Sequence, residues 1–420
     1  MAARQAMNVL LLTQFYWPEV RSAPNNLAAL AEDLQRAGHR VTVITGFPNH
    51  PFGKIYDGYR QRLRQWDDVR GVPVLRVPLY TDHSMSSLRR LLHYGSFALS
   101  AASIGAWTTR RLEVDVILVY LPPWTNWLPI RVLELQHDAP LVYWVSDLWP
   151  EALLGVGKAL RPWQVGALKR LADAVLRRAT TVCVNSPGFQ RVLVQRGVPA
   201  DRLELLVDFA DDEVFHPTAR DPSLAARHGL AGRFNLLYGG NLGAAQGLET
   251  VLEAAALLAD LPELQFVFVG DGTHGALLER RAAELELANV RFIDRQPMEE
   301  MHRFFALADV LVIHLIASPI FEIQVPSKTI AYMACGRPIL CGVAGSAATI
   351  IEDSAAGLCC PPGNPHAMAA RVREFYAMAP EARARLADNG RSAYLAKYTR
   401  DVQARLLEKT LLQAAARGSR

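Results

Sequence analysis

The sequence predicts an α/β fold made of two doubly wound domains with parallel sheets. Short apolar runs alternate with amphipathic helical patterns along almost the whole chain, which is typical of βαβ units. The alternation is interrupted around residues 203–221, where acidic residues and prolines indicate a linker. With 420 residues, the chain is long enough for two or three domains that each have a core.

In the first predicted domain, residues 1–210, the apolar runs are nearly continuous, as expected for parallel strands that are buried on both faces. Helical patterns such as 25–37 and 163–178 lie between them. The predicted strands are 8–13, 40–45, 72–79, 114–120, 141–146 and 181–185.

The second predicted domain, residues 211–398, repeats this rhythm, and the chain then ends in helices. Its predicted strands are 234–238, 264–269, 290–293, 310–314, 338–343 and 357–360, and the final helices are 365–378, 380–398 and 401–416. Ligands of such sheets bind at the carboxyl ends of the strands. We therefore expect a ligand site in a cleft between the two domains.

Composition excludes several classes of protein. Half of the residues are hydrophobic and a fifth are charged, so the chain folds. A net charge of +4 suits an anionic ligand or membrane surface but is too small to indicate nucleic acid. The five cysteines are odd in number and form no C-x-x-C pair, which favours a reducing compartment and argues against a disulfide framework or a structural zinc site.

The chain shows no pattern of a signal peptide or of a membrane-spanning helix. Its most apolar helical segment, 95–109, lies between Arg89-Arg90 and Arg110-Arg111. A helix with basic ends and an apolar middle can lie on an anionic membrane, and it can equally be an ordinary buried helix. We therefore take 86–111 as a candidate for membrane contact, with both interpretations open.

The stretch FEIQVPSKTIAYMACGRP, residues 321–338, predicts a short helix that starts near Pro326 and stops before Pro338. Ser327 and Lys328 lie at its N-terminus. Free N–H groups and the helix dipole make this end attractive to an anion and unfavourable for a lysine. Lys328 therefore needs either an anionic ligand or solvent.

Two glycine-rich turns follow the first two strands of the second domain. In the first, YGGNLGAAQG, the glycines let the backbone approach a ligand and two amides add donors, although a plain tight turn is the alternative. The residues concerned are Gly240, Asn241, Gly243, Gln246 and Gly247.

The second turn contains Gly270, Asp271 and Gly272 and matches G-x-G-x-x-G. A dinucleotide fingerprint belongs after the first strand of a domain, so we interpret this match as a glycine-rich rim of the cleft rather than as a dehydrogenase motif.

The first domain offers two further candidates. After its first strand, Arg21, Ser22 and Ala23 lie in a small polar loop before a helix. After the strand at 141–146, Asp147 and Glu151 form a pair of carboxylates that can serve as a general base or bind a sugar hydroxyl. Asp147 is equally suited to cap the next helix. No spacing of histidines and acids indicates a metal site.

The ordered set of motifs LLTQFYWPE, GHRVTVITGFPNHPFGK, SDLWPE, GGNLGAAQGLET, FVFVGDG, NVRFIDRQP and VPSKTIAYMACGRPIL resembles glycosyltransferases of the GT-B fold in the large retaining family 4. The chain is most similar to the branch that builds bacterial surface polysaccharides such as colanic acid, or adds N-acetylfucosamine to lipid-linked sugars. The resemblance implies two facing Rossmann-like domains with a deep interdomain cleft, and a last helix, 400–416, that crosses back to the N-terminal domain.

The resemblance also implies that the second domain binds a nucleotide-sugar donor. The diphosphate would meet the first glycine turn, Pro326, Ser327 and Lys328, and the base would lie near the second glycine turn and Arg295. The N-terminal domain would bind the acceptor, and Arg21, Ser22, Ala23 and Glu151 are candidates for acceptor binding or for a loop of the cleft. We expect Lys328 and Asp147 to act in catalysis, with no cofactor and no metal.

The chain departs from the family's pattern at two places. The family's acidic pair, E-x7-E, corresponds to Ile323 and Ala331. Its Arg and Lys on the phosphate loop correspond to Asn241 and Gln246, as in the narrower branch. Glu322 is the nearest acid that could replace the lost pair, although it would point away from the side of Ile323 in an extended segment.

From these residues and the resemblance we expect a nucleotide-sugar-dependent glycosyltransferase. Its expected acceptor is a lipid-linked, undecaprenyl-diphosphate-type saccharide in bacterial surface-polysaccharide biosynthesis. It would be cytoplasmic and peripheral on the inner face of the membrane, with no nucleic-acid partner. The alternatives are a nucleotide-sugar epimerase of the same fold and a non-catalytic nucleotide-sugar-binding protein.

Overall fold

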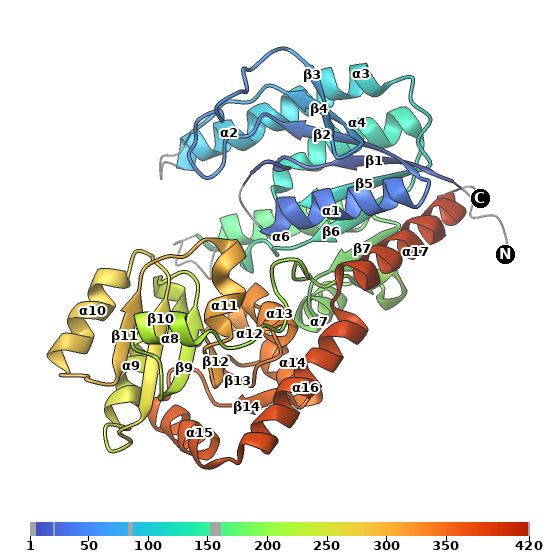
Figure 1. The fold of residues 1–420 in the computed structure, drawn as a ribbon. Helices are drawn as coiled ribbons and strands as arrows, with labels where there is room; N and C mark the ends of the chain where they lie inside the picture. Colours follow the sequence, from blue (N-terminus) through green and yellow to red (C-terminus); the bar gives the residue numbers. More distant parts are fainter. Residues whose placement is uncertain (1–5, 20–21, 83–86, 152–160, 419–420) are drawn as a thin grey trace. The chain divides into compact units, whose positions relative to one another are not determined.

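The computed structural model describes residues 6–19, 22–82, 87–151 and 161–418. The chain divides into two compact units (Figure 1). Unit 1 comprises Met1–Val207 together with Gln403–Arg420, and unit 2 comprises Asp208–Val402. Each unit contains one sheet and the helices that cover it.

The sheet of unit 1 has eight strands in the order β3-β4-β2-β1-β5-β6-β7-β8. All neighbours pair in parallel except β3 and β4, which form an antiparallel hairpin at one edge. The strands are β1 (Asn8–Leu12), β2 (Arg40–Gly46), β3 (Gln65–Val69), β4 (Val72–Val77), β5 (Val116–Leu121), β6 (Leu141–Val145), β7 (Thr181–Val184) and β8 (Leu203–Leu205).

Helices cover both faces of this sheet. Chain order moves outward from β1 to β2 and returns from β4 to β5, so right-handed crossovers put the connecting helices on opposite faces. The helices are α1 (Ser22–Arg36), α2 (Ser87–Ser100), the π-helical turn η1 (Ala101–Gly105), α3 (Ala106–Thr109), α4 (Trp127–His137), α6 (Pro162–Leu176), α7 (Pro187–Gln195) and α17 (Arg400–Gly418).

The last helix, α17, adds a long-range element to unit 1. Its apolar side chains Leu407, Leu411 and Ala414 are fully buried. Glu408 Oε1 lies 3.2 Å from Nε2 of the buried His39, at the start of β2. The C-terminal helix therefore contributes to the core of unit 1, together with the N-terminal strands.

The sheet of unit 2 has six parallel strands in the order β11-β10-β9-β12-β13-β14. This order runs outward on one side of β9 and then outward on the other, which is the doubly wound arrangement. The strands are β9 (Phe234–Gly239), β10 (Leu264–Val269), β11 (Val290–Ile293), β12 (Val310–His314), β13 (Ile339–Gly342) and β14 (Gly357–Cys359).

The helices of unit 2 pack on the two faces of its sheet, with buried Phe266, Phe268 and Val312 among the core residues. They are α8 (Pro222–Arg227), α9 (Glu249–Ala256), α10 (Gly275–Glu284), α11 (Met301–Phe305), α12 (Pro319–Ile323), α13 (Ser327–Ala334), α14 (Ser346–Asp353), α15 (Pro365–Ala377) and α16 (Pro380–Lys397). Within the described ranges, none of the helices combines the length and the hydropathy needed to cross a bilayer.

Every predicted strand is present, with ends that shift by no more than two residues. Two strands were not predicted. β3 contains Asp67 and Asp68, so it does not form an apolar run. β8 has only three residues. The segment around Glu322 is not extended, because Pro319 at the start of α12 favours a helical turn there.

Candidate active site

The candidate site of unit 2 lies where the strand order reverses, between β9 and β12. A glycine loop, residues 239–247, follows β9 and leads to α9, whereas the chain after β12 leads to α13. Because these two connections run to opposite faces of the sheet, they separate at the carboxyl ends of β9 and β12 and leave room for a ligand. The two strands are direct neighbours, with Leu311 opposite Leu237.

The glycine loop is shaped by its own backbone and amides. Gly240 and Gly247 have φ angles of 137° and 55°, which side chains rarely adopt. The Gln246 Oε1 atom accepts hydrogen bonds from Gly243 N at 3.1 Å and from Asn241 Nδ2 at 3.2 Å. The two amides expected to face a ligand thus bond to each other and fix the loop.

The glycines of the second turn are required by its contact with the glycine loop. A Cβ atom on Gly270 would lie 1.9 Å from the Gly240 carbonyl oxygen, and one on Gly272 would lie 2.4 Å from the Leu242 carbonyl oxygen. Leu242 N also donates to the Asp271 carbonyl at 2.7 Å. The two turns therefore interlock through their backbones.

Two charged side chains lie at the rim of this second turn. The carboxylate of Asp271 and the guanidinium of Arg295 are 3.9 Å apart, and both are largely exposed. An exposed pair at this distance contributes little to stability. Both side chains are therefore accessible to solvent at the end of the β10 and β11 strands.

Lys328, in the first turn of α13, points to the glycine loop. Its Nζ donates a hydrogen bond to the Tyr238 hydroxyl and lies 3.7 Å from the centroid of that ring. A Cβ on Gly240 would be 3.4 Å from the same nitrogen. Burial lowers the pKa of Lys328 to about 7. Among the residues that the structure describes, no carboxylate forms an ion pair with it.

The tyrosines Tyr238 and Tyr332 connect β9 to α13. Tyr238 donates its hydroxyl to the Asn241 carbonyl at 2.8 Å. Tyr332, one helical turn after Lys328, accepts a hydrogen bond from Gly239 N at 2.9 Å. Burial raises the pKa of both phenols above the usual range, so both stay neutral. Sequence reasoning did not single out these two tyrosines, although Tyr332 shares a helix face with Lys328.

His314, at the end of β12, contacts the backbone of the glycine loop. Its Nδ1 donates to the Gln246 carbonyl at 2.7 Å, and its Nε2 accepts from Gly363 N at 3.3 Å. Burial lowers the pKa of this imidazole. Those partners fix one neutral tautomer, so His314 has a structural role at this loop.

The two positions of the family's acidic pair hold apolar residues that make structural contacts. Ala331 is buried inside α13. The Ile323 carbonyl accepts a hydrogen bond from Ser346 Oγ at 3.4 Å. Glu322 is exposed on α12, while a Cβ on Gly345 would lie 2.0 Å from its carbonyl oxygen. Pro326 precedes α13, whose N-terminus has no side-chain cap, and Ser327 is exposed.

In unit 1, the two predicted carboxylates have different surroundings. Asp147 follows β6 and is partly buried. Glu151 forms an ion pair with Arg196 at 3.3 Å, and the same buried guanidinium also binds Asp173 at 2.6 Å. Glu151 is therefore held by an internal cation, which weakens its case as a base or sugar ligand.

The predicted polar loop of unit 1 is only partly described. Arg21 lies outside the described residues, and Ser22 and Ala23 form the first turn of α1. Sequence reasoning missed the buried pair of Gln14 and His93 in unit 1. The His93 Nε2 atom accepts a hydrogen bond from Gln14 Nε2 at 2.9 Å, and the His93 Nδ1 atom donates to the Tyr80 carbonyl. Burial lowers the pKa of His93.

Within the described part of the chain, no group of three or more His, Cys, Asp or Glu residues is arranged to hold a metal ion.

Two family models together match most of the chain. The model of group 1 glycosyl transferases matches residues 224–393, and that of the glycosyl transferase 4-like domain matches residues 25–207. The match boundaries fall in unit 2 and unit 1, respectively.

Curated relatives agree with these models. The chain is 30% identical over 339 residues to a putative colanic acid biosynthesis glycosyl transferase, WcaI, of Escherichia coli, covering 79% of this chain and 82% of that protein. It is 27% identical to a probable glycosyltransferase, WbjE, of Pseudomonas aeruginosa, over 64% of this chain and 68% of the relative.

Solved structures match over almost the full length. HepE of Anabaena, in complex with UDP, gives a TM-score of 0.72 at 18% identity and covers 97% of this chain and 100% of its own. Sucrose-phosphate synthase from Thermosynechococcus elongatus gives 0.74 at 18% identity, over 98% and 100%. These likenesses confirm the GT-B fold. The chain therefore belongs to the group 1, or family 4, glycosyltransferases and is a nucleotide-sugar glycosyltransferase.

Proposed function

We propose that the enzyme transfers a sugar from a nucleoside diphosphate sugar to a lipid-linked saccharide during the synthesis of a bacterial surface polysaccharide. The name of its relative WcaI, which refers to colanic acid biosynthesis, supports this class of pathway. The observation that carries the donor assignment is Lys328, a partly buried amine without an acidic partner in the described chain, held against an uncharged glycine loop.

This arrangement suits the chemistry of the leaving group. When the bond to the sugar breaks, negative charge grows on the nucleoside diphosphate. Lys328, the uncapped N-terminus of α13 and the backbone N–H groups of the glycine loop are the groups that can stabilise this charge. Because the loop has Asn241 and Gln246 in place of cations, Lys328 carries most of this task.

The remaining donor and acceptor contacts follow from the same placement. The base would lie against the backbone of Gly270–Gly272, with Arg295 at the rim. The acceptor would bind unit 1, where Asp147 would orient the attacking hydroxyl. The transfer retains the anomeric configuration in this proposal, as in the family that the motifs resemble, and needs no metal.

A panel of nucleoside diphosphate sugars tests the donor assignment. The native state should be stabilised by at least one of UDP-glucose, UDP-N-acetylglucosamine, GDP-mannose, GDP-fucose and dTDP-rhamnose, because a ligand that binds only the folded protein raises its melting temperature. Transfer of labelled sugar to a membrane lipid extract should follow with the same donor. Turnover of the donor in the absence of any lipid would instead indicate an epimerase or a hydrolase.

The helical segment α2–η1–α3 supports binding to a membrane surface. One side of it is buried in unit 1, with Phe97 and Ala98 in the core. The other side exposes four leucines, each more than half accessible, namely Leu88, Leu91, Leu92 and Leu99. Trp107 is also exposed, with the guanidinium of Arg110 4.3 Å above its ring.

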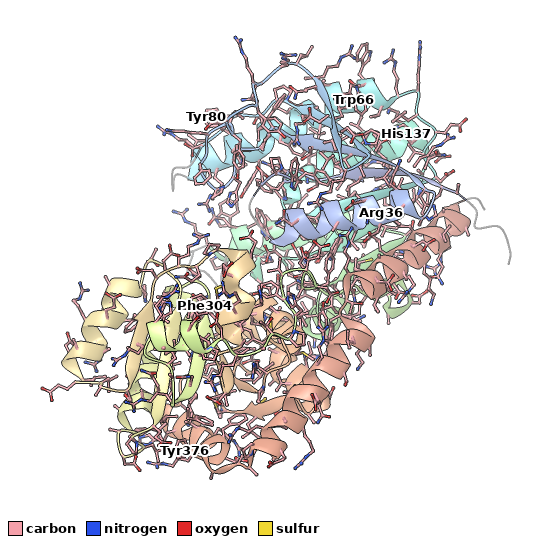
Figure 2. All side chains as sticks on the ribbon, in the orientation of Figure 1. Arg36, Trp66, Tyr80, His137, Phe304 and Tyr376 are labelled. Atoms are coloured by element: carbon pink, nitrogen blue, oxygen red, sulfur yellow. The ribbon has the colours of Figure 1, made fainter. Side chains whose placement is uncertain are left out.

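Other exposed aromatics belong to the same unit, including Trp66 and Tyr80 (Figure 2). Exposed leucines and tryptophan beside arginines match the two requirements of an anionic bilayer surface, apolar area and positive charge. We therefore assign this surface to peripheral contact with the cytoplasmic face of the membrane.

Vesicle sedimentation tests this contact. The protein should sediment with vesicles that contain phosphatidylglycerol, and changing the four flanking arginines to glutamine should release it, since each contributes about 1 kcal/mol near such a surface. Those residues are Arg89, Arg90, Arg110 and Arg111. A control with four exposed arginines of unit 2 changed (Arg280, Arg281, Arg291 and Arg385) should still sediment. If the unchanged protein stays in the supernatant, the segment is only a core helix.

A further inference from the structure

Lys328 has an unusual environment for a lysine that awaits an anion. Its Nζ is enclosed by the Tyr238 ring and hydroxyl on β9 and by the backbone of Gly240. Its hydrogen bond within the described part of the chain goes to a neutral phenol. Burying an ammonium group without a carboxylate is costly, so the charged form is disfavoured while the site is empty.

The other titratable groups around α13 do not compensate for this cost. Tyr332 on the same helix is neutral and bonded to the backbone of Gly239. His314 on β12 is held as a neutral imidazole by Gln246 and Gly363. On the side of α16, Arg391 binds the Ala334 carbonyl at the far end of the helix.

Carboxylates near the site are engaged or exposed. Glu249 in the first turn of α9 lies 3.2 Å from His274, and Asp271 faces Arg295. Glu322 on α12 is exposed to solvent. Burial is accordingly the cause of the lowered pKa of Lys328, and no acid in the described chain offsets it.

We infer that Tyr238 is a positioning residue that holds the Lys328 amine on the glycine loop in the empty enzyme, and that the donor diphosphate takes this amine over together with one proton from solvent. The inference rests on the proposed donor site. The proton is added to Nζ, the new ammonium group then donates to phosphate oxygens, and no covalent bond to carbon changes.

The sign of the pH dependence follows from linkage. Two negative phosphates beside Nζ raise its pKa in the complex. Above about pH 7, where the empty enzyme has lost this proton, each binding event must take one up. Donor affinity should therefore fall as pH rises above 7, by up to about tenfold per unit, and should be independent of pH below it.

The Tyr238 hydroxyl helps to set the pH at which donor affinity begins to fall. In Tyr238→Phe the amine keeps the ring but loses its oxygen acceptor, so the empty-state pKa should fall further. The onset of the pH dependence should then move to lower pH, with a rise in the donor KM at pH 8 and a smaller change in kcat. Tyr376→Phe, on α15 against Phe234, is the matched control and should leave the onset unchanged.

Nuclear magnetic resonance of labelled lysine tests the inference directly, because the chain has only six lysines. With ¹³Cε/¹⁵Nζ-lysine in the full-length protein, one signal should titrate near pH 7 and be absent from Lys328→Arg. Saturating UDP-glucose or GDP-mannose should move that midpoint above pH 9. If the Lys328 signal titrates like that of an exposed lysine, the inference is wrong. It is also wrong if calorimetry at pH 8.5 shows donor binding without proton uptake.

The same measurements separate this inference from the donor assignment. A donor that binds while Lys328 titrates normally overturns the proton uptake and leaves the donor site standing. If no nucleoside diphosphate sugar shifts the Lys328 signal or stabilises the protein, both the donor assignment and the inference are wrong.

Discussion

At the scale of single residues, the proposed donor site contains few charged side chains. The glycine loop has amides where the wider family has cations, and the ribose-binding acids of the family are replaced by Ile323 and the buried Ala331. The sequence predicted where Lys328 lies because a proline and a helix pattern fix the start of α13. It did not predict Tyr238 as its partner, because that contact joins residues 90 positions apart.

Asp147 and Glu151 should respond differently to loss of charge. Asp147→Asn should lower kcat at least tenfold with little change in donor affinity, because the proposed role is on the acceptor hydroxyl. Glu151→Gln should mainly lower stability, by about 1–3 kcal/mol, because Arg196 loses one of its two carboxylates. Steady-state kinetics and thermal unfolding of both variants check this, and an unchanged kcat in Asp147→Asn would reduce that residue to a helix cap.

At the scale of elements, the site depends on two turns that interlock through their backbones. The pattern of glycines predicted both turns, but it suggested a ligand contact for Gly270 and Gly272. The structure shows that each also leaves space for a carbonyl of the glycine loop, while the ligand contact stays a prediction. Which glycine serves a ligand and which serves packing depends on the approach of a neighbouring strand, and local sequence does not encode that approach.

Two alanine substitutions within one motif test this interlock. Gly270→Ala should destabilise the protein by about 2 kcal/mol or more and weaken donor binding, because its φ is 150° and its Cβ would meet the Gly240 oxygen. Gly275→Ala, where the added Cβ meets only Leu242 at 3.8 Å, should do neither. Equal effects of the two changes on melting temperature and donor binding would contradict the packing explanation.

At the scale of the whole molecule, the chain builds a doubly wound, mainly parallel sheet twice and then returns to the first unit. The alternating pattern predicted both sheets, since buried parallel strands are distinctive in sequence. The amphipathic pattern of α17 predicted a helix but carries no information on which core it joins. Its buried leucines and the contact between Glu408 and His39 place residues 403–420 in unit 1.

Leu411→Ala should show that α17 is part of the core of unit 1. Removing this fully buried side chain should cost about 2–5 kcal/mol, because a cavity remains. Leu395→Ala, at a half-exposed position on α16, should cost less than about 1 kcal/mol. Calorimetric unfolding of the two variants would contradict the assignment if Leu411→Ala were the milder change.

The measurement that tests the central claim most directly is sugar transfer by Lys328→Ala. With the donor chosen from the nucleotide-sugar panel and a membrane lipid acceptor, this variant should lose at least tenfold in turnover, about 1.4 kcal/mol of barrier. Its melting temperature should stay near that of the unchanged protein, and Lys409→Ala, at an exposed position on α17, should transfer sugar normally. Transfer by Lys328→Ala at the rate of the unchanged enzyme would show that the switch point of unit 2 does not hold the donor diphosphate through this lysine.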